Sequence, residues 1–148
     1  HLYKNAQKLG CNKIALGHHF DDVIETILLS MIYGAEIKTM MPKLHSTNFE
    51  GMELIRPLYK VKEKDIIAWA ESNDLHFLQC ACKLTAKDAS HELDSKRKET
   101  KELIKYIKTI NPQMDDNVFR SMHNVNLSQI VGYRDSDSGE KHSYLEEY

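Results

Sequence analysis

The sequence predicts an α/β fold in which a mostly parallel sheet is covered by helices. Over the first half of the chain, helical and strand-like patterns alternate in the order helix, strand, helix, strand, helix, strand. Such alternation is typical of parallel strands joined by crossover helices. Two further amphipathic segments, at 96–110 and 115–122, predict carboxyl-terminal helices. We therefore expect a sheet-forming part at 1–82, a loop and helical extension at 83–133, and a tail at 134–148.

The first unit of the chain is predicted to be a helix over 1–9, a strand over 13–17 and a second helix over 21–33. Gly10 stops the pattern of the first helix. Because that pattern begins at His1 without an N-cap, we expect the chain to be a fragment of a longer protein. The predicted buried face of the second helix consists of Ile24, Ile27, Leu28 and Met31.

The patterns that follow are weaker. Residues 35–50 are mixed and predict a loop, whereas short strands are expected at 52–56 and 76–78. The segment 61–73 has helical periodicity, and its predicted buried side is formed by Ile66, Ile67, Trp69 and Ala70. Polar composition predicts a mobile loop over 83–95, and the acidic composition after Tyr133 predicts a disordered tail.

Composition excludes several classes of protein. The net charge is -2, so a nucleic-acid partner would require a local basic patch rather than a generally basic surface. No apolar run approaches the roughly 20 residues that span a bilayer, and we expect no membrane partner. The three cysteines are an odd number and a poor disulfide framework, which favours a reducing, cytoplasmic location.

Two imidazoles and two carboxylates stand where the predicted strand at 13–17 meets the next helix. The segment reads Gly17-His18-His19-Phe20-Asp21-Asp22. Ligands of open α/β sheets bind beyond the carboxyl ends of the strands. There the glycine would admit a flat ligand, the carboxylates could hold Mg²⁺ against phosphate, and the imidazoles could contact phosphate or transfer protons. The alternative is structural, because an Asp at a helix N-terminus stabilises that helix by about 0.5–2 kcal/mol without any ligand.

The segment from Leu16 to Thr26, LGHHFDDVIET, resembles the second signature of the PP-loop ATP pyrophosphatases that modify tRNA. Later segments, including Ile55-Arg56-Pro57-Leu58 and Cys80-Ala81-Cys82, extend the similarity over residues 1–133 and favour the TtcA-type tRNA 2-thiocytidine synthetases. The resemblance implies an adenine-nucleotide α-hydrolase-like domain, and the ATP-dependent replacement of the 2-oxygen of a tRNA cytidine by sulfur. Three alternatives stay open: a tRNA uridine thiolase, a tRNA lysidine synthetase, and a non-catalytic nucleotide- or tRNA-binding module.

By this resemblance Asp22 is the main catalytic residue and Asp21 a second, while Gly17 and His18 line the ATP site. Cys80 is implied as a ligand of a [4Fe–4S] cluster in the full-length protein, whereas Cys82 is one residue away from the usual spacing. The implied cofactors and partners are ATP, Mg²⁺, the iron–sulfur cluster, tRNA and a sulfur donor, with a homodimer among the expected assemblies. The family's Ser-Gly-Gly-x-Asp-Ser loop does not occur in the chain. We expect it ahead of His1 and expect the chain alone to be inactive.

Basic residues recur every three or four positions along the helix predicted at 96–110. They are Arg97, Lys98, Lys101, Lys105 and Lys108. Such a row could follow the tRNA backbone. The alternative is an ordinary solvated helix face, on which Glu99 and Glu102 pair with neighbouring lysines.

Overall fold

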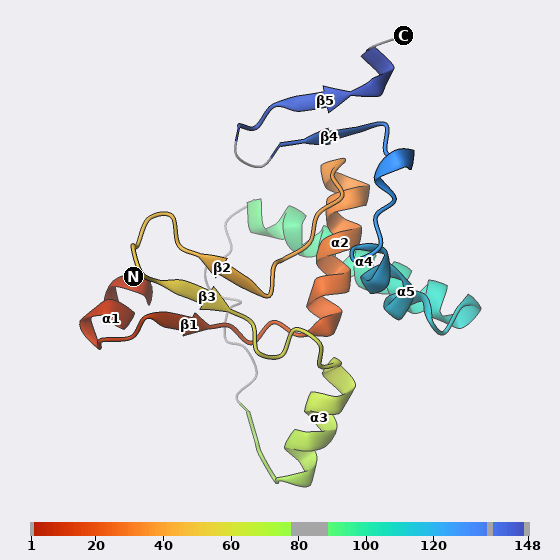
Figure 1. Cartoon of the computed structure of the whole chain (residues 1–148). Helices are drawn as coiled ribbons and strands as arrows, with labels where there is room; N and C mark the ends of the chain where they lie inside the picture. Colours follow the sequence, from red (N-terminus) through yellow and green to blue (C-terminus); the bar gives the residue numbers. More distant parts are fainter. Residues whose placement is uncertain (1, 78–88, 136–137, 147–148) are drawn as a thin grey trace.

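The computed structural model of the chain describes residues 2–77, 89–135 and 138–146 (Figure 1). It confirms the α/β class. The helices are α1 (Leu2–Lys8), α2 (Phe20–Gly34), α3 (Glu63–Ser72), α4 (Ala89–Ile110) and α5 (Met114–Ser121), with single 3-10 turns at Leu127–Gln129 and Tyr144–Glu146. The strands are β1 (Lys13–Ala15), β2 (Lys43–His45), β3 (Glu53–Ile55), β4 (Gly132–Arg134) and β5 (Lys141–Ser143).

The main sheet has the order β1-β3-β2 and is mixed in direction. β1 and β3 are parallel, with Ile14 opposite Leu54, as the helix–strand alternation predicts. β2 pairs with β3 antiparallel and lies in the segment expected to be a loop. Its sequence, Lys-Leu-His, is too short to show an alternating pattern, and all three residues are exposed. The expected strands at 13–17 and 52–56 are therefore confirmed, but one of the two pairings of this sheet is antiparallel.

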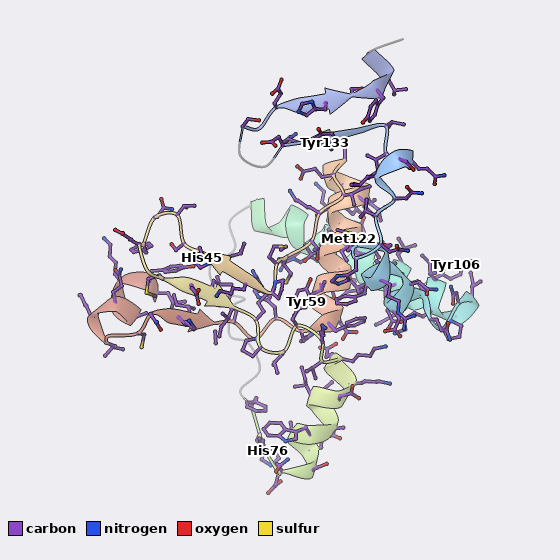
Figure 2. All side chains as sticks on the ribbon, in the orientation of Figure 1. His45, Tyr59, His76, Tyr106, Met122 and Tyr133 are labelled. Carbon is purple, nitrogen blue, oxygen red and sulfur yellow. The ribbon has the colours of Figure 1, made fainter. Side chains whose placement is uncertain are left out.

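The core lies around α2, which is packed against α4 and α5 (Figure 1). Val23, Ile24 and Ile27 are at most 1% exposed and form the centre of the cluster, together with Phe20 and Tyr59. Figure 2 shows Tyr59 and Met122 beside α2. The predicted buried stripe of this helix is confirmed at Ile24 and Ile27, whereas its last member, Met31, is 48% exposed.

The helix at 61–73 is confirmed as α3, but the burial predicted for it is wrong. None of its residues is buried, and Trp69 is 59% exposed. α3 extends away from the sheet (Figure 1), and Ile67 on its apolar side is 51% exposed. The short strand expected at 76–78 is also absent at His76 and Phe77, and its last residue lies outside the described residues.

The secondary structure of the carboxyl-terminal part differs from the expectation at two places. α4 begins at Ala89, within the segment expected to be a mobile loop, and 132–143 contains the antiparallel hairpin of β4 and β5 rather than a disordered tail. Tyr133 stacks on His142 across the hairpin, with ring centroids 4.6 Å apart. A Cβ at Gly132 would lie 2.6 Å from the carbonyl oxygen of His142, so the strands approach closely because that residue is glycine. In the part of the chain that the structure describes, no helix is long and apolar enough to cross a bilayer.

Candidate functional site

The candidate site lies at the junction between β1 and α2. The N–H of Leu16 donates to the carbonyl of Ile55 at 2.9 Å, which extends the parallel ladder by one residue past β1. His19 has extended backbone angles and serves as the N-cap of α2, so the helix begins at Phe20. The three residues from Gly17 to His19 thus bridge the end of the strand and the start of the helix, as the sequence predicts for a ligand site in an α/β sheet.

Asp22 has a structural contact and also faces a cavity. One oxygen of its carboxylate, Oδ2, accepts a hydrogen bond from the backbone N–H of His19 at 2.9 Å. This bond is the capping-box contact in which the carboxylate at the third helical position binds the N–H of the N-cap residue. The Asp22 side chain also lines a cavity of about 420 Å³, and it is 31% exposed. The structural meaning that the sequence left open is therefore confirmed for Asp22, while ligand binding by this cavity-facing carboxylate stays a prediction.

Asp21 points to a different neighbour. Its Oδ2 accepts a hydrogen bond from the backbone N–H of Glu63 at 2.7 Å, at the first residue of α3. The side chain is not part of the cavity that Asp22 lines. One carboxylate is therefore at the cavity and the other at the start of α3, while the His19 imidazole lies between them, 3.8 Å from Asp21 and 3.5 Å from Asp22.

His18 is held in place by Arg56. The Nε of Arg56 donates to Nδ1 of His18 at 3.3 Å, and its Nη1 donates to the carbonyl of Met41. Since Nδ1 accepts this bond, the neutral ring carries its proton on Nε2. His18 lines the same cavity as Asp22, so the sequence correctly placed these two residues together. Arg56, which follows β3, positions the imidazole from a strand neighbouring β1.

The space around the Cα of Gly17 is open. A Cβ built on it would meet no atom within 4 Å, and its φ is not in the left-handed region. The fold itself therefore does not require glycine there, and the expectation that a ligand approaches this backbone stays a prediction.

The cavity has a second wall, which the sequence did not connect with the first. His18, Asp22, Glu25 and Thr26 line it from the junction and from α2, whereas Asp94, Arg97, Lys98 and Lys101 line it from α4. Lys101 lies 3.4 Å from the Glu25 carboxylate. Burial raises the pKa of Glu25 above its usual value, and the charge and hydrogen bond of Lys101 only partly oppose that rise. The basic row on α4 supplied the signal for this wall, but periodicity alone cannot tell which element a helix face meets.

The same row of basic residues does not form one uniform solvated face. Lys108 lies 2.7 Å from Asp115 on α5, and Lys101 pairs with Glu25 on α2. Glu99 accepts a hydrogen bond from the Tyr33 hydroxyl at 2.8 Å, so this carboxylate also joins α4 to α2. Part of the row therefore fixes α4 to its neighbours, and Arg97 and Lys98 are at the cavity.

The iron-ligand prediction falls outside this site. Cys80 and Cys82 lie outside the described residues, and Cys11 is exposed with a free thiol. Among the residues that the structure describes, no group of three or more His, Cys, Asp or Glu side chains could hold a metal ion.

Comparison with known proteins identifies the family. The sequence model of the PP-loop domain matches residues 1–83. The chain is 39% identical over 130 residues to a tRNA-cytidine(32) 2-sulfurtransferase of Geobacter metallireducens, covering 88% of this chain and 48% of that protein. It is 52% identical over 79 residues to the protein of the same name from Neisseria meningitidis serogroup A, covering 53% of this chain and 24% of that protein.

Among solved structures, the chain is similar in fold to the U34-tRNA thiolase NcsA from Methanococcus maripaludis with its [4Fe-4S] cluster. The TM-score is 0.62 at 21% sequence identity, covering 93% of this chain and 43% of that one. The chain spans about half the length of the curated relatives that it matches over most of its own length. With the parallel β1–β3 pair, the Gly-His-His-Phe-Asp-Asp junction and the matching family model, the chain belongs to the family of PP-loop domains.

Proposed function

We propose that this chain supplies one wall of the active site of an ATP-dependent tRNA-cytidine 2-sulfurtransferase. The observation that carries the proposal is the placement of Asp22, which lines a cavity between α2 and α4 together with His18 and three basic side chains. The names of the relatives, tRNA-cytidine(32) 2-sulfurtransferases, support cytidine in tRNA as the substrate and sulfur transfer as the reaction. The alternative is a tRNA uridine thiolase, because the solved structure of similar fold is named a U34-tRNA thiolase.

The proposed reaction has two steps. The 2-oxygen of cytosine attacks the α-phosphorus of ATP, the bond to the β-phosphate oxygen breaks, and pyrophosphate leaves. A sulfur nucleophile from a donor then attacks carbon 2, and AMP departs with the original oxygen. Adenylation is needed because it converts a poor leaving group into a good one.

The role proposed for Asp22 follows from charge. Attack by the 2-oxygen leaves the cytosine ring positively charged until the exocyclic amino group loses a proton, because N1 is bonded to the ribose and N3 carries no proton. A fixed carboxylate beside the ring stabilises that charge as it develops. Asp22 is fixed in this sense, since one of its oxygens is already hydrogen bonded to the backbone of His19. His18, with its proton on Nε2, can donate a hydrogen bond into the same cavity.

The cofactor expectations rest on different grounds. Mg²⁺ commonly binds through one or two carboxylates, substrate phosphates and water, and the second oxygen of Asp22 suits that kind of ligand set. When bound, the ion would neutralise the phosphates of ATP. The assignment of Cys80 as an iron ligand, the identity of the sulfur donor and the homodimer stay predictions. Gly17 is proposed to lie against ATP because its backbone is open.

The test is Asp22→Asn in the complete gene product, expressed in cells that lack the natural copy. The amide oxygen of Asn can still accept the His19 hydrogen bond, so the helix cap is retained while the negative charge is lost. We expect 2-thiocytidine in the tRNA of these cells, measured by mass spectrometry of nucleosides, to fall below a few per cent of the level with the unaltered protein. Thermal unfolding of the purified variant is expected to be close to that of the unaltered protein.

Asp21→Asn is the matched comparison, because it makes the same change one residue away and outside the cavity. Retained thiolation in Asp21→Asn with loss in Asp22→Asn supports a catalytic role for Asp22 alone. Equal loss in both would return Asp21 to the catalytic pair. Normal 2-thiocytidine with Asp22→Asn would refute the role given to Asp22, and 2-thiouridine in place of 2-thiocytidine would identify a uridine thiolase.

A further inference from the structure

We propose that Arg97 and Lys98 form a phosphate-binding wall that holds the tRNA backbone next to the base that faces Asp22. The inference rests on the proposed function for its choice of polyanion. It begins from the cavity between α2 and α4, which these two residues line from α4 and Asp22 lines from α2. The interacting elements are rigid helices rather than loops, which suits a site that must place one nucleotide accurately.

The helix that carries the two cations is firmly held. Thr100, which follows them on α4, is only 1% exposed, and Ile104 packs against the core cluster. On the same helix, Glu99 accepts a hydrogen bond from Tyr33 of α2, and Lys101 pairs with Glu25 of α2. α4 is therefore attached to α2 on both sides of the buried threonine, and the positions of Arg97 and Lys98 relative to Asp22 are fixed by packing.

The charges of the cavity identify which cations are available for a ligand. Its acidic members are Asp22, Glu25 and Asp94, and its basic members are Arg97, Lys98 and Lys101. Lys101 is already paired with Glu25. Within the described residues, Arg97 and Lys98 are exposed and have no ion pair.

A phosphodiester is the chemistry that such a pair of cations fits. A guanidinium can bind two phosphate oxygens at once, and an ammonium beside it adds a point charge. With Asp22 near the reacting ring, Arg97 and Lys98 would hold the phosphate that flanks the same nucleotide. The row on α4 thus contributes to tRNA binding at its amino-terminal part, where it meets the cavity, while Lys108 serves the packing of α5.

The experiment measures the affinity of the complete gene product for unmodified tRNA at several salt concentrations. The test variant is Arg97→Gln with Lys98→Gln, the charge-preserving variant is Arg97→Lys with Lys98→Arg, and the matched control is Lys64→Gln. Lys64 is exposed on α3 and has no ion pair in the described structure. ATP affinity is measured on each protein, to separate a nucleotide phosphate from a tRNA phosphate.

We expect the glutamine pair to weaken tRNA binding about tenfold at low salt and to lower the slope of log affinity against log salt by roughly 1.5, as expected for two lost phosphate contacts. ATP affinity should change less than twofold, and the charge-preserving variant should bind tRNA nearly normally. An unchanged slope, or a loss equal to that of Lys64→Gln, would overturn the proposal. A loss of ATP affinity with normal tRNA binding would overturn it as well, because the phosphate would then be that of the nucleotide.

These outcomes are separable from those of the proposed function. If the unaltered protein makes 2-thiocytidine but the glutamine pair binds tRNA normally, the wall is wrong and the function stands. If no thiolated cytidine is formed but the glutamine pair still loses tRNA binding, the function is wrong and the tRNA-binding wall stands.

Discussion

Replacing Asp115 with Ala is expected to remove a large part of the stability of this chain. Asp115 stands in the first turn of α5 and is 3% exposed. Its Oδ2 lies 2.7 Å from Nζ of Lys108 on α4 and 3.5 Å from Nζ of Lys62, the N-cap of α3. Its Oδ1 accepts the backbone N–H of Asp116 at 3.0 Å. One buried carboxylate therefore joins the starts of α3 and α5 to the end of α4.

The magnitude follows from what the alanine leaves behind. Removing one partner of a buried ion pair typically costs about 3–5 kcal/mol, because the remaining charge is left uncompensated. The side chains of Lys62 and Lys108 are 29% and 39% exposed, so water can solvate the freed ammonium groups. We therefore expect the lower end of that range, about 3 kcal/mol.

The assay is urea unfolding of the 148-residue chain at pH 7, followed by circular dichroism. With a denaturant slope of about 1.5 kcal/mol per molar, the loss shifts the midpoint by about 2 M. Asp116→Ala is the matched control, because the Asp116 carboxylate is 45% exposed and Lys62 still has its ion pair with Asp115 after the change. The control should lose at most about 1 kcal/mol. Equal losses in the two variants would show that Asp115 does not act as the buried centre of this cluster.

The same cluster predicts a pH dependence. Burial, the largest influence, raises the pKa of Asp115, but Lys108, the N–H of Asp116 and Lys62 together outweigh it and lower the pKa below its usual value of 3.8. A carboxyl group with a lowered folded-state pKa stabilises the fold fully above its unfolded-state pKa. That contribution is lost as the pH falls through the folded-state pKa. The stability difference between the unaltered chain and Asp115→Ala should therefore be constant near neutrality and shrink below pH 3.8.

Three further outcomes are expected. Gly17→Ala should leave the unfolding midpoint unchanged or slightly raised, because the added Cβ meets no atom. The same substitution should weaken ATP binding by the complete gene product, measured by calorimetry, and a normal ATP affinity would remove this residue from the site. Ile27→Ala should cost about 3 kcal/mol in urea unfolding, whereas Ile110→Ala, at a site 69% exposed, should cost less than about 0.5 kcal/mol. The Glu53 carboxyl, hydrogen bonded by Lys13 and Lys43, should titrate with a pKa of about 2 in an NMR pH series, and a value near 4.5 would mean that these bonds are not held in solution.

The sequence predicted the long periodic helices well. The stripe of α2 recurs over several turns, so Ile24 and Ile27 were correctly expected to face the interior. β2 was missed because three residues with one apolar side chain, Leu44, carry no alternation. A strand of that kind is specified by its partner, here β3, and not by its own composition.

Burial was harder to predict than secondary structure. Ile67 and Trp69 have helical spacing, but a pattern shows that a face is apolar without showing what covers it. The hairpin of β4 and β5 was missed for another reason, since acidic composition dominates the segment that contains its turn at Gly139. The first error concerns contacts with distant parts of the chain, whereas the second concerns a local pairing of neighbouring strands.

The site was predicted in part. The strand–helix junction and the common placement of Asp22 and His18 were predicted because local sequence determines where a strand ends and a helix begins. The cavity wall on α4 was not connected with them, because Arg97 is far from His18 in sequence and near it only after α4 packs on α2. The hydrogen bond from Glu63 to Asp21 was missed for the same reason.

The placement of α2 has a consequence for how this chain can change during evolution. One face of the helix forms the core, including Val23 and Ile27, and another lines the cavity, including Asp22 and Glu25. A substitution over most of the helix therefore affects either packing or the cavity. Freedom to vary is concentrated in the last turns, at positions such as Met31 and Ile32, which are 48% and 50% exposed. Neutral drift in this element should accordingly accumulate towards its carboxyl end.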